Sequence, residues 1–180
     1  MRHLLRVNLT ERRVETETVP RSFRDRFVSG KGLGAAYLLD ELPAGTDPLS
    51  PENRLYFMFG PLTGHAPGTS RYAAITKSPL TGAFVDSYSG GHFPSKVRFA
   101  MPGYLGIVFE GRAEEPVYLD VDEAGVSIED ACDLWGSHDA RETAREFPDR
   151  DTKVAAIGPA GENEVAFATI RWAPSASATA

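Results

Sequence analysis

The sequence predicts an α+β domain in which two packed, mostly antiparallel β-sheets are accompanied by a few short helices. Short apolar or alternating segments recur between turn residues along most of the chain, whereas helical patterns are few and brief. These strands and helices do not alternate regularly, which argues against a doubly wound parallel sheet. The chain has 180 residues, of which 42% are hydrophobic, so it can bury the core of one domain.

The first half of the chain is predicted to begin with a hairpin and continue with two helices. Alternating apolar and polar residues on both sides of Thr10-Glu11 indicate the hairpin. A polar segment and then a leucine-bearing segment that ends at Pro43 indicate the helices, and two apolar runs closed by turns follow them. The expected elements are strands 4–8 and 13–18, helices 21–28 and 30–42, and strands 54–59 and 72–76.

The second half is again predicted to consist mainly of strands. Gly103 leads into the apolar run YLGIVFEG, and the turn Asp122–Gly125 indicates a further hairpin. A charged surface helix then precedes two strands that flank GPAGEN. The expected elements are helix 95–99, strands 104–111, 116–121 and 126–128, helix 138–147, and strands 153–157 and 164–170.

Composition restricts the possible partners and the compartment. The net charge of −6 argues against a nucleic-acid-binding protein, which would present a basic face. No apolar run approaches the roughly 18 residues of a membrane span, and no secretory signal is recognisable at the N-terminus. The single cysteine, Cys132, fits the cytosol and cannot hold an iron–sulfur cluster, which needs about four thiolates. We therefore expect a cytoplasmic protein with no nucleic-acid or membrane partner.

Residues 60–93 are the part of the sequence that carries a candidate binding site. Six glycines and three prolines surround the single arginine Arg71, and the block ends in Ser89-Gly90-Gly91 followed by His92-Phe93. Glycines let a backbone approach a ligand and present bare N–H groups, and arginine offers a rigid fork of donors to an anion. The block can cradle a large anionic cofactor, or it can form ordinary hairpin turns.

A second glycine-rich segment, Gly30-Lys31-Gly32-Leu33-Gly34-Ala35, formally fits the dinucleotide-binding pattern. The residues before it are polar rather than a buried strand, and no acidic residue ends a second strand about 20 positions later. We therefore interpret this segment as the start of a helix that packs on a sheet, with no ligand role.

Four motifs, taken in order and spacing, resemble a known family. GPLTG at 60–64, GTSRY at 68–72, TKSPLTG at 76–82 and SGGHF at 89–93 are similar to the N-terminal domain of the aldehyde ferredoxin oxidoreductase family. The likeness extends from Leu5 to Ile170. The members of this family are tungsten- or molybdenum-pterin enzymes.

The resemblance implies a fold and an activity. The family's N-terminal domain forms a saddle under a tungsten- or molybdenum-bis-pterin with Mg²⁺ at the pterin phosphates. The family oxidises an aldehyde with water to a carboxylic acid and passes the electrons through a 4Fe–4S cluster to ferredoxin. The sequence does not say which of the two metals is used, or which aldehyde.

The resemblance also implies roles for single residues. Arg71 matches an arginine that lies between the pterin and the cluster, and Ser89, Gly90 and Gly91 match a segment that contacts the pterin and its phosphates. Tyr88 stands where the family can have an asparagine whose backbone carbonyl helps to hold Mg²⁺, so Tyr88 is a candidate carbonyl donor. No catalytic residue and no direct metal ligand is expected in this chain. The alternative for Arg71 is an ordinary surface salt bridge.

The resemblance leaves several arrangements of the protein open. We expect residues 1–170 to form the metallopterin-binding domain and residues 171–180, where the likeness stops, to form a divergent, disordered tail. The family's cluster cysteines and acid–base residues lie in further domains, so the chain is expected to be truncated before them. It can be a fragment, one subunit of a split enzyme paired with a separate C-terminal chain, a degenerate domain that has lost its chemistry, or a non-catalytic metallopterin-binding or assembly module. The partner can also be a second copy of the chain in a homo-oligomer.

Overall fold

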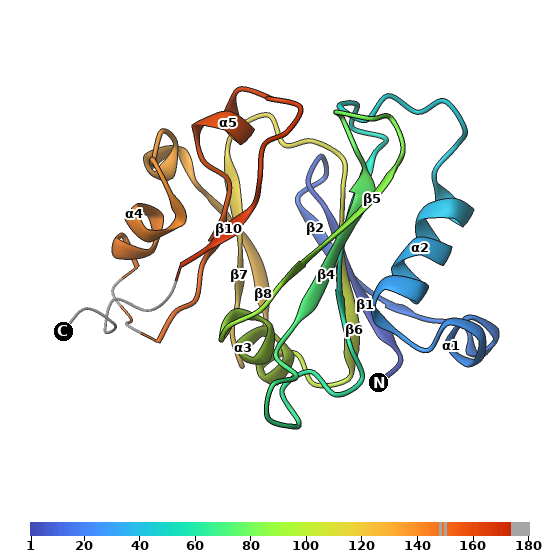
Figure 1. Cartoon of the computed structure of the whole chain (residues 1–180). Coiled ribbons are helices and arrows are strands. Elements are labelled where there is room, and N and C mark those ends of the chain that lie inside the picture. The colour runs from blue at the N-terminus through green and yellow to red at the C-terminus, as the bar shows by residue number, and fades with distance from the viewer. Residues whose placement is uncertain (148, 150, 174–180) are drawn as a thin grey trace.

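A six-stranded β-sheet runs through the centre of the molecule (Figure 1). The computed structural model describes residues 1–147, 149 and 151–173. The strand order is β2-β1-β6-β3-β4-β5, in which β1 and β6 are parallel and the other neighbours are antiparallel. The strands are β1 (His3–Asn8), β2 (Arg13–Thr18), β3 (Arg54–Phe59), β4 (Tyr72–Lys77), β5 (Phe84–Ser89) and β6 (Tyr104–Glu110).

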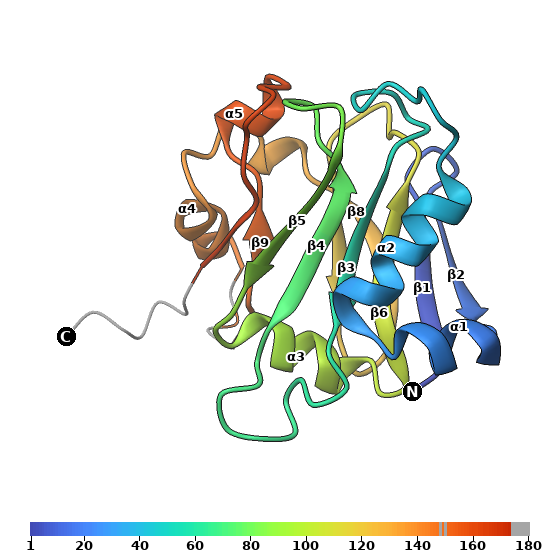
Figure 2. The ribbon, with the colours of Figure 1, turned by 45° about the vertical axis from the view of Figure 1, so that its right-hand side comes forward.

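Helices α1 (Arg21–Phe27) and α2 (Gly30–Glu41) cover one face of this sheet (Figure 2). Their inner side chains pack on strand residues that are fully or almost fully buried. At Gly34 a methyl group would lie 2.4 Å from the Ile75 Cδ1 atom, so α2 approaches the sheet more closely than any other residue type would allow. The glycine-rich start of α2 therefore serves packing, as its sequence context indicates.

The opposite face carries a second layer of small elements. The layer contains two ladders of two strands each, which pair β7 with β8 and β9 with β10. A second hydrophobic core lies between this layer, α3 and the sheet. The elements of this side are α3 (Phe93–Ala100), β7 (Val117–Val121), β8 (Val126–Asp130), a 3₁₀ turn (Cys132–Leu134), α4 (Ala140–Arg145), β9 (Ala155–Ala156), α5 (Pro159–Glu162) and β10 (Arg171–Trp172).

The α+β class predicted from the sequence is confirmed, and so is most of the element order. The strand expected over 164–170 is wrong. Glu164 has a φ of +54°, which a strand does not admit, and Ala168 N–H bonds to the Val165 carbonyl in a turn. Strand β5 was not predicted, because its residues were interpreted as part of the glycine-rich block.

Ordered structure extends beyond residue 170. Arg171 and Trp172 pair with Ala156 and Ala155, and the buried Ala173 donates its N–H to the Val154 carbonyl. Residues 171–173 therefore do not belong to a disordered tail. The rest of the predicted tail, 174–180, lies outside the described residues.

A half-buried charge network ties α2 to the sheet. The Glu41 carboxylate at the end of α2 accepts hydrogen bonds from Arg6, from Arg54 at 2.8 Å and from the Tyr56 hydroxyl at 2.7 Å. Arg6 also pairs with Glu17, which accepts a hydrogen bond from Tyr37 at 2.9 Å. Because these charges are paired and hydrogen-bonded, they can be removed from water without a large free-energy penalty.

The two tyrosines of this network predict a loss of stability at alkaline pH. Burial, and then a hydrogen bond to Glu41, raises the pKa of Tyr56, while burial and Glu17 raise the pKa of Tyr37. The folded chain thus keeps protons that the unfolded chain releases above about pH 10. The contribution of these two protonated phenols to the free energy of unfolding is fully present below about pH 10 and is lost as the pH rises above it.

Absorbance titration of the phenols at 295 nm checks this prediction. We expect the phenols of Tyr56 and Tyr37 to ionise only well above pH 10 or on unfolding, so the native signal near pH 10 should be smaller than that of all six tyrosines. The urea-unfolded chain, in which all phenols are exposed, is the control. A single native transition near pH 10 that accounts for every tyrosine would contradict the prediction.

Candidate functional site

The chain brings Arg71, Ser89, Gly90 and Gly91 together at one end of the sheet. Arg71 immediately precedes β4, and Ser89 at the end of β5 pairs with Tyr72. A Cβ atom on Gly90 would lie 3.4 Å from the Ser70 carbonyl oxygen and 3.9 Å from Arg71 Cγ. Segments about 20 positions apart in the sequence therefore meet where the resemblance places a cofactor contact.

Two short hydroxyl side chains fix the backbone of this region. Thr63 is 2% exposed, and its Oγ1 donates to the Arg71 carbonyl at 2.9 Å while it accepts from the Gly60 N–H at 3.0 Å. Ser70 Oγ donates to the Gly91 carbonyl and accepts from Ser95 Oγ at 2.6 Å. These bonds join the loop before β4 to the glycines after β5 and to the start of α3.

The Arg71 side chain is exposed and forms no ion pair with another described residue. The surface salt bridge that the sequence left open as an alternative therefore has no partner in the described part of the chain. Such a guanidinium on an anchored backbone is suited to bind an external anion, because its planar fork of donors matches the geometry of a carboxylate or phosphate.

Tyr88 and Ser89 lie on a strand rather than in the loop that the sequence suggested, so their side chains point to opposite faces. Ser89 faces Tyr72, where burial raises the pKa of the Tyr72 phenol and a hydrogen bond with Ser89 opposes that rise. Tyr88 lies on the face of Asp86, which pairs with Lys31 of α2 at 3.0 Å. A contact of Tyr88 with Mg²⁺ would rest on its carbonyl alone and stays a prediction.

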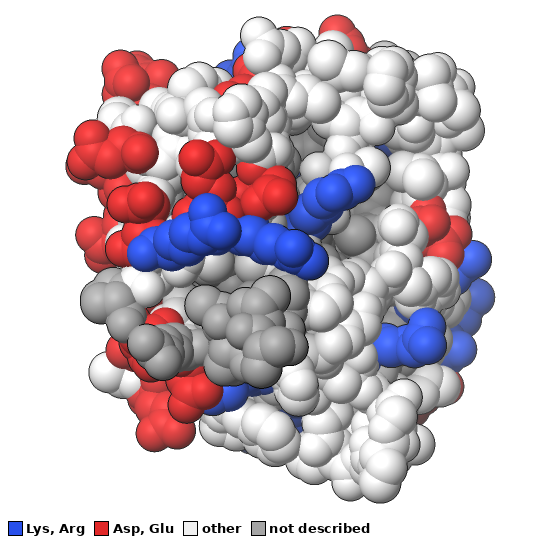
Figure 3. Space-filling view, turned by 60° about the vertical axis from the view of Figure 1, so that its left-hand side comes forward, with Lys and Arg blue, Asp and Glu red and all other residues white. Residues whose placement is uncertain are grey.

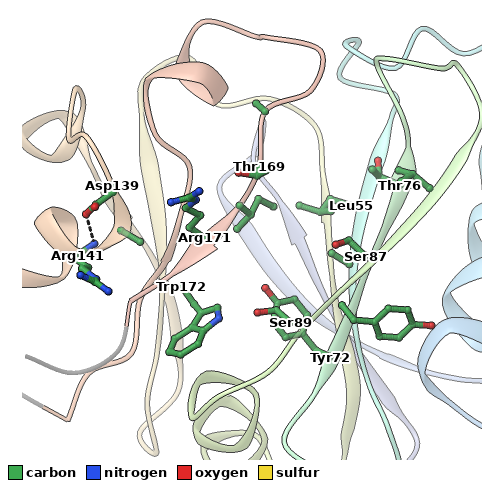
Figure 4. Close-up of a pocket in the computed structure, with 16 residues that line it drawn as sticks. Leu55, Tyr72, Thr76, Ser87, Ser89, Asp139, Arg141, Thr169, Arg171 and Trp172 are labelled. Carbon is green, nitrogen blue, oxygen red and sulfur yellow. Dashed lines mark hydrogen bonds between the residues drawn. The ribbon is translucent and has the colours of Figure 1, made fainter. Parts of the chain in front are cut away.

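A cavity of about 820 Å³ opens beside Ser89, between the β4–β5 edge of the sheet and the C-terminal elements. Arg171 and Trp172 of β10 lie on one side of it, with Tyr72, Ser87 and Ser89 on the other (Figure 4). Hydroxyl groups, aromatic rings and guanidinium groups therefore share one concave surface, which is the mixture that binding a polar ring system requires.

Trp172 is a site residue that the sequence reasoning missed, because it was assigned to the tail. A Cβ atom on Gly91 would lie 2.7 Å from the Trp172 Cη2 atom, so the indole packs directly on the glycine. Gly91 also has a φ of +82°. A tryptophan directly after an apolar segment was the available signal, but nothing in the sequence says which distant glycine it covers.

The charges around the cavity suit an anionic ligand. Figure 3 shows basic side chains in a row on this side of the molecule, beside acidic ones. Arg141 and Arg171 line the cavity, are exposed and form no ion pair with another described residue. Asp139 caps α4 by accepting from the Arg141 and Glu142 N–H groups, and these bonds lower its pKa. The Asp139 carboxylate is thus already hydrogen-bonded to the first N–H groups of α4.

The described side chains form no group of three or more His, Cys, Asp or Glu residues that could hold a metal ion. Cys132 is exposed and not in a disulfide. None of the described helices is long and apolar enough to cross a membrane. What the site offers is guanidinium groups, hydroxyls and glycine backbone, which fit the phosphates and ring edges of a pterin better than a bare cation.

Comparisons with known proteins identify the family of this chain. The family described as "Aldehyde ferredoxin oxidoreductase, N-terminal domain" matches residues 4–179. The tungsten-containing aldehyde ferredoxin oxidoreductase of Pyrococcus abyssi is 43% identical over 171 residues, which cover 93% of this chain and 28% of the relative. The aliphatic sulfonate oxidoreductase, WOR-like subunit, of Pyrococcus furiosus is 33% identical over 186 residues, covering 93% of this chain and 29% of that protein.

A solved structure shows the same fold. The active site complex BamBC of benzoyl-coenzyme A reductase, in complex with 1,5-dienoyl-CoA, superposes with a TM-score of 0.88. It is 34% identical, and the match covers 96% of this chain and 27% of that chain.

The fold and the comparisons thus define an α+β domain of the kind that is found in larger oxidoreductases. The chain belongs to the aldehyde ferredoxin oxidoreductase family and corresponds to its N-terminal domain. It spans about 28% of the length of the curated relatives it matches. The family match continues to residue 179, so the expectation that the likeness stops at Ile170 is wrong.

The contact between Gly91 and Trp172 yields a prediction about stability. Gly91→Ala should cost about 1 kcal/mol for the positive φ and roughly 1–3 kcal/mol more for the clash with the indole. Gly82→Ala is the matched control, since Gly82 has a φ of +67° but nothing within 4 Å of its Cβ position. Urea unfolding measures both losses.

The clash can be isolated with a double-mutant cycle. When Trp172 is replaced by Ala, the substitution Gly91→Ala should lower the free energy of unfolding only about as much as Gly82→Ala does. If the Gly91 and Gly82 variants lose equal stability, or if removing the indole changes nothing, the packing of Trp172 on Gly91 is refuted.

Proposed function

We propose that this chain is the metallopterin-binding domain of a tungsten-dependent aldehyde:ferredoxin oxidoreductase. The observation that carries the proposal is that Arg71, which forms no ion pair with a described residue, meets Ser89, Gly90 and Gly91 at the positions of the family's motifs. The cavity beside Ser89 and the family membership support it. Tungsten is favoured over molybdenum because the curated relatives are named as tungsten-containing enzymes.

In this proposal the chain binds and orients the cofactor. The Arg71 guanidinium would donate hydrogen bonds to the anionic groups of the cofactor, and the N–H groups of Gly90 and Gly91 would donate to its acceptor atoms. Ser89 adds a hydroxyl, and the Tyr88 carbonyl would contact Mg²⁺ at the pterin phosphates. The bound tungsten-pterin supplies the redox chemistry of aldehyde oxidation. The 4Fe–4S cluster and the ferredoxin contact would lie in the rest of the enzyme, and we place the protein in the cytoplasm.

A second possibility is a non-catalytic metallopterin-binding or assembly module, or one subunit of a split enzyme. It is favoured by the match to the aliphatic sulfonate oxidoreductase, WOR-like subunit, of Pyrococcus furiosus, because that relative is named as a subunit. A neighbouring reading frame that encodes a cysteine-containing C-terminal half would favour the split enzyme, and its absence would favour the carrier.

The isolated 180-residue chain should show no aldehyde-dependent dye reduction and no 4Fe–4S signal in electron paramagnetic resonance. The reason is that one cysteine cannot ligate a cluster. Activity assays with iron analysis on the purified chain check this. Turnover by the isolated chain with stoichiometric iron would refute the proposal that the 4Fe–4S cluster lies outside this domain.

The role of Arg71 can be tested by substitution. Arg71→Ala should weaken metallopterin retention roughly ten- to a hundredfold in a complex that contains this domain, because charge-assisted hydrogen bonds contribute about 1.5–3 kcal/mol each. The melting temperature should hardly change, since the side chain is exposed and unpaired among the described residues. Arg71→Lys should restore binding only in part, because lysine keeps the charge but loses the fork.

Pterin content by oxidative fluorescence and tungsten content by mass spectrometry give the retention. Arg13→Ala is the control, because Arg13 is an exposed arginine of β2 that pairs with Glu11 and Glu15. Full cofactor occupancy in the Arg71→Ala variant would remove Arg71 from the site.

A further inference from the structure

The two glycines of the candidate site lie beyond the end of a strand ladder. The pairing of β4 with β5 ends at Tyr72 and Ser89, so Gly90 and Gly91 follow the last paired residue. Gly91 has a φ of +82°, which is only one of the many backbone conformations open to glycine. Such a pair of glycines loses much conformational freedom on binding a ligand, unless another group already holds its backbone.

A serine in the loop before β4 holds this backbone. The Ser70 Oγ donates a hydrogen bond to the Gly91 carbonyl. The Ser70 carbonyl oxygen lies 3.4 Å from the position of a Cβ atom on Gly90, so Ser70 lies beside both glycines. A trans peptide bond is planar, and its carbonyl and N–H point in opposite directions. Because the Gly91 carbonyl is held, the N–H of His92 in the same peptide plane is held as well.

A second serine strengthens this bond. The Ser95 Oγ, in the first turns of α3, donates a hydrogen bond to the Ser70 Oγ at 2.6 Å. A hydroxyl has one proton and a carbonyl can only accept, so the Ser70 proton goes to Gly91 and the Ser70 oxygen accepts from Ser95. A hydroxyl that accepts one hydrogen bond donates the next one more strongly. The two serines therefore act in series on the Gly91 carbonyl.

The loop that carries Ser70 also carries Arg71 and is itself fixed. The Arg71 N–H donates to the Thr69 carbonyl at 2.8 Å, and the Arg71 carbonyl accepts from the buried Thr63 Oγ1 at 2.9 Å. Ser70 directly precedes Arg71, so the bond from its side chain connects this fixed loop to the glycines that follow β5. The arginine and the glycines of the candidate site are thus joined through one hydroxyl group.

We propose that Ser70 and Ser95 are positioning residues, which hold the backbone of Gly90 and Gly91 beside Arg71 before the cofactor binds. The inference rests on the proposed function, because it names the residues that prepare that site. Both serines act through the Gly91 carbonyl and need no contact of their own with the cofactor. Donor groups that are held in place beforehand lose less conformational freedom on binding, so the ligand binds more tightly.

Backbone order, measured by ¹⁵N relaxation on the 180-residue chain, tests whether the serines hold the glycines. In the unsubstituted chain the order parameters of the Gly91 and His92 amides should be near the value of about 0.85 that is typical of rigid backbone. In Ser70→Ala they should fall toward about 0.6, because the Gly91 carbonyl loses its partner. Ser95→Ala should lower them less, because the bond from Ser70 remains. Unchanged order parameters in Ser70→Ala overturn the proposal.

Cofactor retention in a complex that contains this domain is the second readout. Ser70→Ala should lower the retention of tungsten and pterin about two- to tenfold, which is the effect of one lost hydrogen bond between neutral groups. Ser70→Thr should restore retention, because threonine keeps the hydroxyl. The matched control is Ser50→Ala, because the Ser50 Oγ also donates to a backbone carbonyl, at 2.8 Å, in the loop before β3. It should leave retention unchanged.

These variants also distinguish positioning from a role in folding alone. The melting temperature of Ser70→Ala should fall no more than that of Ser50→Ala. Full retention in Ser70→Ala overturns the proposal, and so does a loss of retention that follows the melting temperature and is not restored in Ser70→Thr. If Ser70→Ala does not fold, Ser95→Ala decides, and unchanged order parameters and retention in that variant overturn the proposal.

The two readouts separate this inference from the proposed function. Mobile glycines in Ser70→Ala, together with no cofactor in the unsubstituted complex, would support the positioning of the backbone and count against the proposed function. Bound cofactor in the unsubstituted complex, together with unchanged order parameters in Ser70→Ala, would leave the proposed function standing and overturn the positioning.

Discussion

The central constraint in this structure is that the sheet is apolar on both faces and must be covered twice. Most residues of β3 and β6 are buried, with no exposed alternation that would let one face meet water. On one face α1 and α2 cover the sheet. Gly34 allows α2 to approach the sheet closely, and the Glu41 carboxylate at the end of α2 bonds to Arg6 and Arg54. On the other face two short ladders cover it only in part.

The candidate site lies at the β4–β5 edge of this sheet. Strand β5 is at the edge of the sheet, and the pair formed by Asp86 and Lys31 holds it from the helix side. On its other face, Ser89 borders the cavity and Gly91 receives the indole of Trp172. A helix layer on one face of an edge strand leaves the other face of that strand free for a ligand, while the backbone of the strand stays fixed. Binding groups held in this way lose little conformational freedom on binding.

The sequence predicted the elements whose pattern is contained in one short stretch of the chain, and it did not predict contacts between distant stretches. Buried runs such as Arg54–Phe59 were predicted because their apolar pattern is independent of their neighbours. Strand β5 was not, because an edge strand of mixed polarity next to glycines looks like a loop. The motifs that carry the family resemblance pointed to Arg71, Gly90 and Gly91, and the fold brings these residues together although they lie about 20 positions apart. Their role as cofactor contacts stays a prediction. The place of Trp172 in the site could not be predicted, because its contact with Gly91 depends on how the second layer packs against the sheet.

The candidate site depends on the second layer as well as on the sheet. Trp172 belongs to β10, and β10 pairs with β9. The position of the indole over Gly91 therefore depends on how this short ladder packs in the second layer. A ligand that stabilises this position of Trp172 must stabilise the packed ladder by the same free energy, because coupling between two sites acts equally in both directions.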